Sequence, residues 1–84
     1  MDRQGGERTV LMYSRRTCGL CDEARAVLMR ERSRTPFRFD EVFIDGDEAL
    51  ERDFGLRVPV VLIDGREQFE YTIHPGRLHG LLRR

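Results

Sequence analysis

Short apolar runs along the chain alternate with stretches whose apolar residues recur at helical spacing. Apolar residues in unbroken runs or at every second position predict strands at residues 8–13, 37–44, 59–63 and 67–73. Apolar residues three and four apart predict helices at residues 18–33, at residues 47–54 and from Pro75 onward. The predicted order is β-α-β-α-β-β-α in one domain over residues 8–84, preceded by a flexible segment over residues 1–7.

The connections between these elements predict how the strands pair. The first two strands are joined through a helix, so we expect them to be parallel with a right-handed crossover. The Asp-Gly pair at residues 64–65 is typical of a two-residue hairpin, so the last two strands should be antiparallel. We also expect residues 42–44 to be buried on both faces, and Phe69, Tyr71 and Ile73 to share one face of the last strand.

Composition and charge narrow the classes of partner. Fifteen arginines match fifteen acidic residues and the chain has no lysine, so it lacks the excess positive charge that nucleic-acid binding needs. No run approaches the roughly 20 apolar residues of a membrane span, and the polar first residues contain no signal-peptide core. We therefore expect a cytoplasmic protein that binds neither nucleic acid nor membrane. In a reducing compartment, lone cysteines are more often catalytic or metal-binding than structural.

The two cysteines, Cys18 and Cys21, are the only ones in the chain and lie where the first strand turns into the first helix. A helix N-terminus, with its unpaired N–H groups and positive dipole end, favours an anion such as a thiolate. Because the thiolate is the nucleophile in disulfide exchange, Cys18, at the start of the helix and more exposed, is the expected nucleophile. Cys21 lies one turn further on and inward, where it would resolve a mixed disulfide formed at Cys18. A Cys-x-x-Cys pair at such a turn is a signature of redox chemistry.

Charged residues beside the cysteines act in opposite directions. Arg15 and Arg16 precede the expected nucleophile, and their positive charge favours the thiolate. Asp22 and Glu23 in the first helical turn stabilise the helix but repel a thiolate. Arg15 and Arg16 are candidate substrate-binding residues, and the alternative is that both are solvated surface arginines.

Taken together, these motifs resemble the glutaredoxins, the smallest form of the thioredoxin fold, over about residues 8–82. Residues 13–18 match that family's pattern of a tyrosine, a small hydroxyl residue, a basic residue and then the nucleophilic cysteine. Residues 57–60 match the segment that carries the family's cis-proline. In detail the chain is most similar to small bacterial glutaredoxin-like proteins, which share a Cys-x-Leu-Cys-Asp motif and a Val-Pro-Val strand followed by an Asp-Gly hairpin.

This resemblance implies a thioredoxin-like α/β fold with a four-stranded mixed sheet, strand order 2-1-3-4, and helices on both faces. It implies a thiol-disulfide oxidoreductase without a cofactor, in which Pro59 is cis and the backbone of Val58 pairs with that of a bound thiol. Arg15, by its match to the family's basic residue, would pair with a carboxylate of that thiol. The expected monomer would use a low-molecular-weight thiol such as glutathione, or a flavoprotein reductase, as electron donor and a disulfide-containing protein as substrate.

Two departures from the glutaredoxin pattern concern glutathione. Glutaredoxins usually carry an aromatic residue and a proline between the cysteines, where this chain has Gly19 and Leu20. They also carry a Gly-Gly pair and an acid before the last helix, which hold the amino-acid end of glutathione, and residues 71–77 contain no such pair. Neither change removes thiol-disulfide chemistry, so we expect disulfide reduction with glutathione as a poor donor.

Two other functions would use the same cysteines. A zinc site would combine Cys18 and Cys21 with His74 and His79, although about fifty residues separate the two pairs, far more than in a zinc finger. The other alternative is a thioredoxin-fold protein without catalysis, either an adaptor or an iron–sulfur carrier that uses Cys18 from two protomers. A cluster carrier needs only one cysteine, so the presence of both favours redox chemistry.

Overall fold

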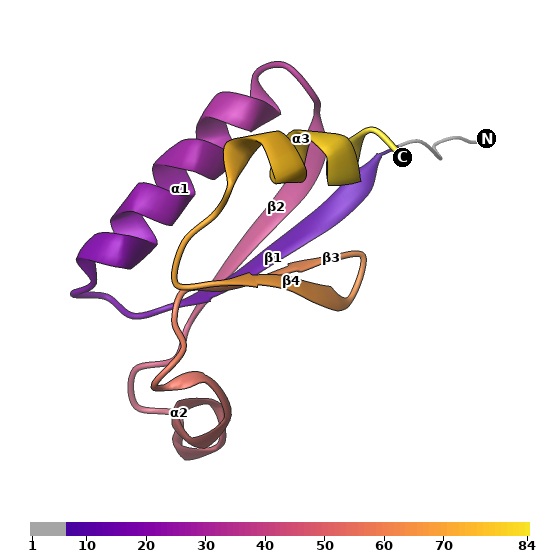
Figure 1. Cartoon of the computed structure of the whole chain (residues 1–84). Helices are drawn as coiled ribbons and strands as arrows, with labels where there is room; N and C mark the ends of the chain where they lie inside the picture. Colours follow the sequence, from indigo (N-terminus) through magenta and orange to yellow (C-terminus); the bar gives the residue numbers. More distant parts are fainter. Residues whose placement is uncertain (1–6) are drawn as a thin grey trace.

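A computed structural model describes residues 7–84 of the chain, and its elements follow the predicted order (Figure 1). The four strands are β1 (Arg8–Ser14), β2 (Phe37–Phe43), β3 (Val60–Ile63) and β4 (Arg66–Glu70). The three helices are α1 (Gly19–Arg32), α2 (Glu48–Phe54) and α3 (Pro75–Leu82). No helix within residues 7–84 is long and apolar enough to cross a membrane. Of the segment predicted to be flexible, residues 1–6 lie outside the described residues.

The sheet has the expected strand order β2-β1-β3-β4 (Figure 1). β1 pairs in parallel with β2, through the crossover helix α1, and antiparallel with β3. β3 and β4 form the predicted antiparallel hairpin, which turns at Asp64 and Gly65. Both turn residues have positive φ angles, 51° and 83°, as a type I′ two-residue turn requires.

Helices cover both faces of the sheet, as the resemblance implies. α1 and α3 lie side by side on one face, where Val10 and Met12 of β1 are buried against them. Because side chains alternate along a strand, Tyr13 points to the other face. There the ring of Phe54 in α2 stacks on the ring of Tyr13, with 4.2 Å between the ring centres. α2 therefore packs near the C-terminal end of β1, the end from which the cysteine loop leaves the sheet.

The main core lies between the sheet and the layer formed by α1 and α3. Leu28 of α1, Phe37 of β2 and Leu78 of α3 are buried together there. Burying a large apolar side chain contributes about 1.5–3 kcal/mol, so each of these residues stabilises the contact between the helices and the sheet. The helix that carries the cysteines is therefore anchored in the hydrophobic core through Ala24 and Leu28.

One carboxylate is buried at the contact between α1 and α3. Glu31 of α1 has a side chain only 3% exposed, and it accepts hydrogen bonds from Arg34 and from the hydroxyl of Thr35. Its Oε2 lies 2.5 Å from Nδ1 of His79 on α3. Burial alone would raise the pKa of Glu31, but the hydrogen bonds from His79, Arg34 and Thr35 lower it to about 2. The buried group is therefore a carboxylate anion that joins the two helices.

Two predicted burial patterns are wrong. Phe43 is 37% exposed rather than buried on both faces, because it is the last residue of an edge strand. Tyr71 does not share the buried face of Phe69 and Ile73. β4 ends one residue before it, and a positive φ of 69° at Tyr71 turns its side chain outward, where it is 46% exposed. Alternation of faces holds only while the backbone stays extended, which explains the second error.

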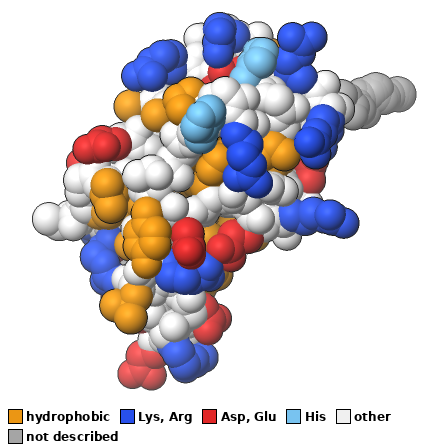
Figure 2. Space-filling model, viewed as in Figure 1, with side chains coloured by type: hydrophobic (Ala, Val, Ile, Leu, Met, Phe, Trp, Pro, Cys, Tyr) orange, Lys and Arg blue, Asp and Glu red, His pale blue; other side chains and the backbone are white. Residues whose placement is uncertain are grey.

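The surface mixes charges of both signs with a small number of exposed apolar side chains. On the face seen in Figure 2, hydrophobic side chains gather on the left, over the start of α1 and the segment after β4. Leu20, Leu56 and Tyr71 are the most exposed large apolar residues of the described chain. The hydroxyl of Tyr71 donates to the backbone carbonyl of Leu56 at 2.8 Å, so the segment after β4 is tied to the segment before β3.

Candidate functional site

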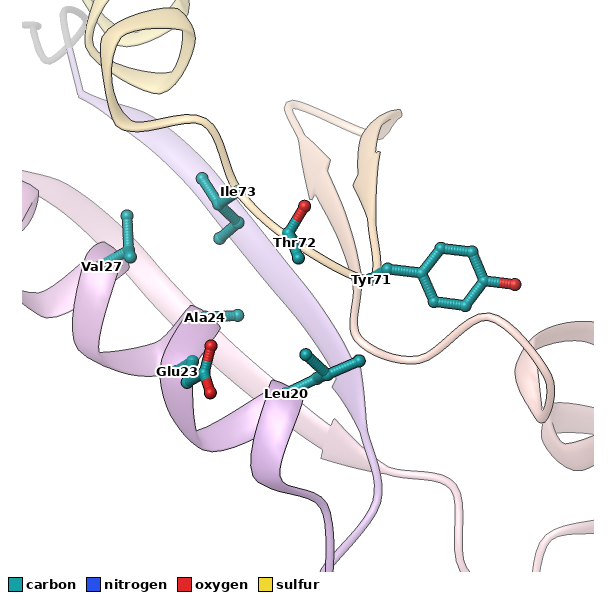
Figure 3. A pocket seen from close by; sticks show the side chains of 7 residues that line it. All are labelled: Leu20, Glu23, Ala24, Val27, Tyr71, Thr72 and Ile73. Carbon is teal, nitrogen blue, oxygen red and sulfur yellow. The ribbon is translucent and has the colours of Figure 1, made fainter.

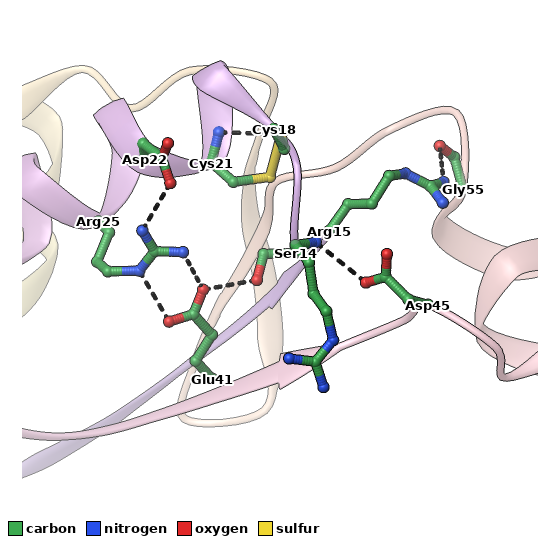
Figure 4. Close-up of a disulfide and its surroundings, with 10 residues drawn as sticks. Ser14, Arg15, Cys18, Cys21, Asp22, Arg25, Glu41, Asp45 and Gly55 are labelled. Carbon is green, nitrogen blue, oxygen red and sulfur yellow. Dashed lines mark hydrogen bonds and ion pairs between the residues drawn. A yellow bond between two sulfur atoms is a disulfide. The ribbon is translucent and has the colours of Figure 1, made fainter.

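The loop between β1 and α1 places the two cysteines together. Cys18 and Cys21 form a disulfide, and their Cα atoms are 5.2 Å apart. Cys18 is the N-cap residue of α1, and its sulfur accepts a hydrogen bond from the backbone N–H of Cys21 at 3.1 Å (Figure 4). Cys21 is fully buried, whereas Cys18 is half-buried. Both cysteines therefore lie where the sequence predicts them, one at the helix N-terminus and within reach of solvent, the other one turn deeper.

The segment before β3 lies beside the cysteine loop. The Val58–Pro59 peptide bond is cis, as the resemblance to glutaredoxins implies, and Pro59 is fully buried. The next residue, Val60, pairs with Tyr13 near the end of β1. Since β1 and β3 are antiparallel, the loop after β1 and the loop before β3 meet at the same end of the sheet. The predicted residues Val58 and Pro59 are thus brought next to the loop that carries Cys18.

Arg15, three residues before Cys18, has its guanidinium held by α2. It donates to both carboxylate oxygens of Glu51, at 2.7 and 2.8 Å, and to the backbone carbonyl of Gly55 at 3.0 Å. Figure 4 shows the side chain of Arg15 extending toward Gly55 and away from the disulfide. The hydrogen bonds to Glu51 raise the pKa of Arg15 and lower the pKa of the Glu51 carboxyl. The residue expected to bind a thiol's carboxylate already binds a carboxylate of its own chain.

Arg16 is held in a different way. Its backbone N–H donates to Oδ1 of Asp45 at 3.1 Å, and its guanidinium lies over the ring of Phe43, 4.8 Å from the ring centre. A cation over an exposed aromatic ring contributes about 0.5–1 kcal/mol. Within residues 7–84, no carboxylate lies at ion-pair distance from this guanidinium. Of the two predicted arginines, Arg16 is the exposed one, with no carboxylate partner among the described residues.

A polar network beneath α1 was not expected from the sequence (Figure 4). Glu41 of β2, whose side chain is only 14% exposed, accepts hydrogen bonds from Arg25 of α1 and from the fully buried hydroxyl of Ser14. Arg25 also donates to Asp22 at 2.9 Å. The hydrogen bond from Arg25, opposed by burial, holds the pKa of Glu41 below its usual range. The only signal in the sequence is strand alternation, which puts Ser14 and Glu41 on the face that α1 covers.

This network ties the first turns of α1 to the sheet, and we expect Glu41→Ala to destabilise the domain by about 2 kcal/mol. The substitution leaves Arg25 and the buried Ser14 hydroxyl without their acceptor. The melting temperature should fall by about 10 °C, measured by circular dichroism. The matched control is Asp40→Ala, a residue of the same strand outside the network, expected to change stability by less than about 0.5 kcal/mol. Equal losses in both variants would show that the network does not stabilise the domain.

Comparisons with known proteins agree with this geometry. A sequence profile of the glutaredoxin-like domain family (DUF836) matches residues 9–83. The chain belongs to the glutaredoxin-like domain family. A crystal structure of a structural-genomics target protein from X. campestris is 40% identical to this glutaredoxin-like domain, covers 87% of it and 93% of its own chain, and has a TM-score of 0.75. A solution structure from Nitrosomonas europaea is 29% identical, covers 96% of this chain and 98% of its own, and has a TM-score of 0.79.

More distant structures share the fold of this glutaredoxin-like domain. A thioredoxin variant from Halobacterium salinarum is 21% identical, covers 90% of this chain and 72% of its own, and has a TM-score of 0.65. No curated protein matches the chain. The family, the thioredoxin-like α/β fold and a cysteine pair at disulfide distance are thus established.

The glutaredoxin-like domain has a small apolar hollow beside the first turns of α1 (Figure 3). The hollow measures about 70 Å³ and lies between α1 and the segment after β4, with Leu20, Val27, Tyr71 and Ile73 among its lining residues. Leu20, one of the lining residues, stands between the two cysteines in the sequence. Tyr71, which lines one side of the hollow, belongs to the segment in which glutaredoxins usually carry a Gly-Gly pair. In this domain, residues with side chains stand in place of those glycines.

The two histidines that a zinc site would need have other partners. His74 is the N-cap residue of α3, and its Nδ1 accepts the backbone N–H of Arg77 at 3.1 Å. Nδ1 of His79 lies against Glu31. In the described part of the chain, no three histidine, cysteine, aspartate or glutamate side chains gather in a way that could hold a metal ion. The fold therefore does not bring the four candidate zinc ligands together.

Proposed function

We propose that this glutaredoxin-like domain is a thiol-disulfide oxidoreductase, with Cys18 as the nucleophile and Cys21 as the resolving cysteine. The observation that carries the proposal is the position of the Cys18 sulfur, at the N-cap of α1 and partly exposed, beside a fully buried Cys21. The positive end of a helix favours a thiolate, and the thiolate is the attacking species. Because Cys21 is buried, external disulfides reach Cys18 first.

In the proposed reaction, the Cys18 thiolate attacks one sulfur of a substrate disulfide. A Cys18–substrate mixed disulfide forms, and the other substrate sulfur leaves as a thiolate that takes up a proton from solvent. Cys21 then loses its proton and attacks the Cys18 sulfur, which releases the second substrate thiol and forms the Cys18–Cys21 disulfide. An external donor, either two monothiols or one dithiol, returns the two electrons. We place this cycle in a cytoplasmic monomer, since thiols are kept reduced in that compartment.

The substrate, in this proposal, lies along the segment before β3. The backbone of Val58 pairs with the backbone beside the substrate's cysteine in the manner of an added strand, and Pro59 lies next to the exchanging sulfurs. Arg16, which is exposed beside Phe43, is available to a carboxylate or carbonyl of the substrate. Support for this arrangement comes from the register of β1 and β3, which brings the Val58–Pro59 segment beside the cysteine loop.

We expect glutathione to be a poor electron donor. Tyr71 and Thr72 occupy the segment in which glycines would let the amino-acid end of glutathione approach, and Pro75 removes an N–H donor from the first turn of α3. Losing one charge-assisted hydrogen bond lowers affinity roughly tenfold or more. Steady-state reduction of a small disulfide, with dithiothreitol and glutathione as alternative donors, measures this against an ordinary glutaredoxin. Turnover with glutathione equal to that of the glutaredoxin would show that the changed segment has no effect.

A further inference from the structure

The pair formed by Arg15 and Glu51 has the geometry of a filled carboxylate-binding site. Two parallel N–H···O bonds join the guanidinium to the two carboxylate oxygens, which is the strongest and most specific form of this pairing. A third donor of Arg15 is taken by the carbonyl of Gly55. Both side chains of the ion pair are about one third exposed, so the pair borders solvent rather than the core. A carboxylate arriving from solvent would have to displace Glu51.

The position of this pair relates it to the proposed substrate path. Arg15 belongs to the loop that leads to Cys18, and Gly55 begins the segment that leads from α2 to Val58. The guanidinium therefore bridges the two segments between which the substrate's backbone is proposed to pair. A second arginine of the same segment, Arg57, is likewise engaged, by Glu67 at 2.6 Å and Glu70 at 3.0 Å. Arg15 and Arg57 are thus both paired with carboxylates of the protein.

We propose that Glu51 is a specificity-determining residue that occupies Arg15 and so discriminates against small thiols that carry a carboxylate near the sulfur. The chemistry of the preferred substrate follows from this. A cysteine inside a polypeptide has an amide where a small thiol such as glutathione has a free carboxylate, and it needs no cation there. Disulfides of polypeptides are therefore the substrate class that the Arg15–Glu51 pair favours. This inference rests on the proposed function, because it concerns what reaches Cys18.

The test compares glutathione with its diethyl ester, in which both carboxylates are replaced by neutral esters; the added ethyl groups are the same in every variant, so their effect does not change between variants. In Cys21→Ser protein, the equilibrium constant for the mixed disulfide at Cys18 is measured with each thiol by mass spectrometry of the intact protein. The quantity compared between variants is the constant for glutathione divided by the constant for the diethyl ester. Any loss of folded protein in a variant affects both constants equally and cancels in this ratio. Adding Glu51→Ala should raise the ratio in favour of glutathione by about tenfold, because Arg15 becomes free for the ligand's carboxylate. Glu48→Ala, an exposed glutamate in the same helix, should leave the ratio within about twofold of its starting value.

A second set of variants tests whether the increase in this ratio depends on Arg15. In the Glu51→Ala protein, adding Arg15→Ala should return the ratio to its starting value. With Glu51 present, Arg15→Ala alone should change the ratio little. The effects of the two substitutions should therefore be strongly non-additive. An unchanged ratio in Glu51→Ala, or a tenfold fall in the ratio on replacing Arg15 alone, would overturn the inference. A failure of Cys18 to form a mixed disulfide with either thiol would overturn the proposed function and this inference with it. A normal mixed disulfide with an unchanged ratio would overturn this inference alone.

Discussion

We expect Cys18→Ser to abolish disulfide reduction and Cys21→Ser to accumulate a covalent complex with the substrate. These are the expected results for a nucleophile at the N-cap of α1 and a buried partner one turn further on. Without the Cys18 sulfur no mixed disulfide forms, and the rate should fall roughly a thousandfold or more, to that of the free thiol donor. Without the Cys21 sulfur, the mixed disulfide at Cys18 can be resolved only by a second external thiol, so it persists.

The measurement follows the steady-state reduction of a peptide disulfide and, in parallel, the mass of the intact protein after a single addition of substrate. Only Cys21→Ser should gain the mass of the bound thiol. Thr17→Ser, next to Cys18 and exposed, serves as the matched control and should behave like the parent protein. Trapping at Cys21 in the Cys18→Ser protein, to the same extent as at Cys18 in the other variant, would overturn the assigned roles.

The largest expected loss of stability comes from Glu31→Gln, which removes the buried anion between α1 and α3. The partners that lose their charged acceptor are His79 on α3, and Arg34 and Thr35 beyond the end of α1. Replacing a charged acceptor of several hydrogen bonds by a neutral amide should cost about 2–3 kcal/mol. For a domain of this size, that lowers the melting temperature by about 10–20 °C. Glu23→Gln, exposed on the same helix, is the control and should change stability by less than about 0.5 kcal/mol.

The loss of stability caused by Glu31→Gln should depend on pH. The pKa of Glu31 is about 2 in the folded protein and about 4.5 in the unfolded chain, so the unfolded chain binds the proton first. Its contribution to stability is therefore complete above about pH 5 and is lost as the pH falls from about 4.5 to 2. Urea unfolding of parent and Glu31→Gln at about pH 7, 4 and 2.5 should show a difference that shrinks toward low pH. A difference independent of pH would show that packing, and not the ionised carboxylate, stabilises this contact.

The order of the elements and the place of the cysteines follow from local patterns in the sequence. Unbroken and alternating apolar runs specify strands locally, because each side chain's face follows from the extended backbone alone. The Asp64–Gly65 turn was likewise predictable, since positive φ angles are demanded by the turn and tolerated by those residues. The position of Cys18 at a helix N-terminus needed only the boundary between a strand and a helix.

Which side chains meet across those elements depends on how the elements pack in three dimensions. Arg15 and Glu51 are 36 positions apart, and nothing in either segment indicates that the guanidinium has a partner on α2. The burial of Glu41 with Arg25 depends on the register of β2 against β1 and on where α1 crosses them. Local patterns constrain the backbone of each element, whereas contacts between charged groups depend on distances that exist only after the sheet and helices have packed. For that reason the sequence predicted the cysteine chemistry, and the structure was needed to show that Arg15 is already occupied.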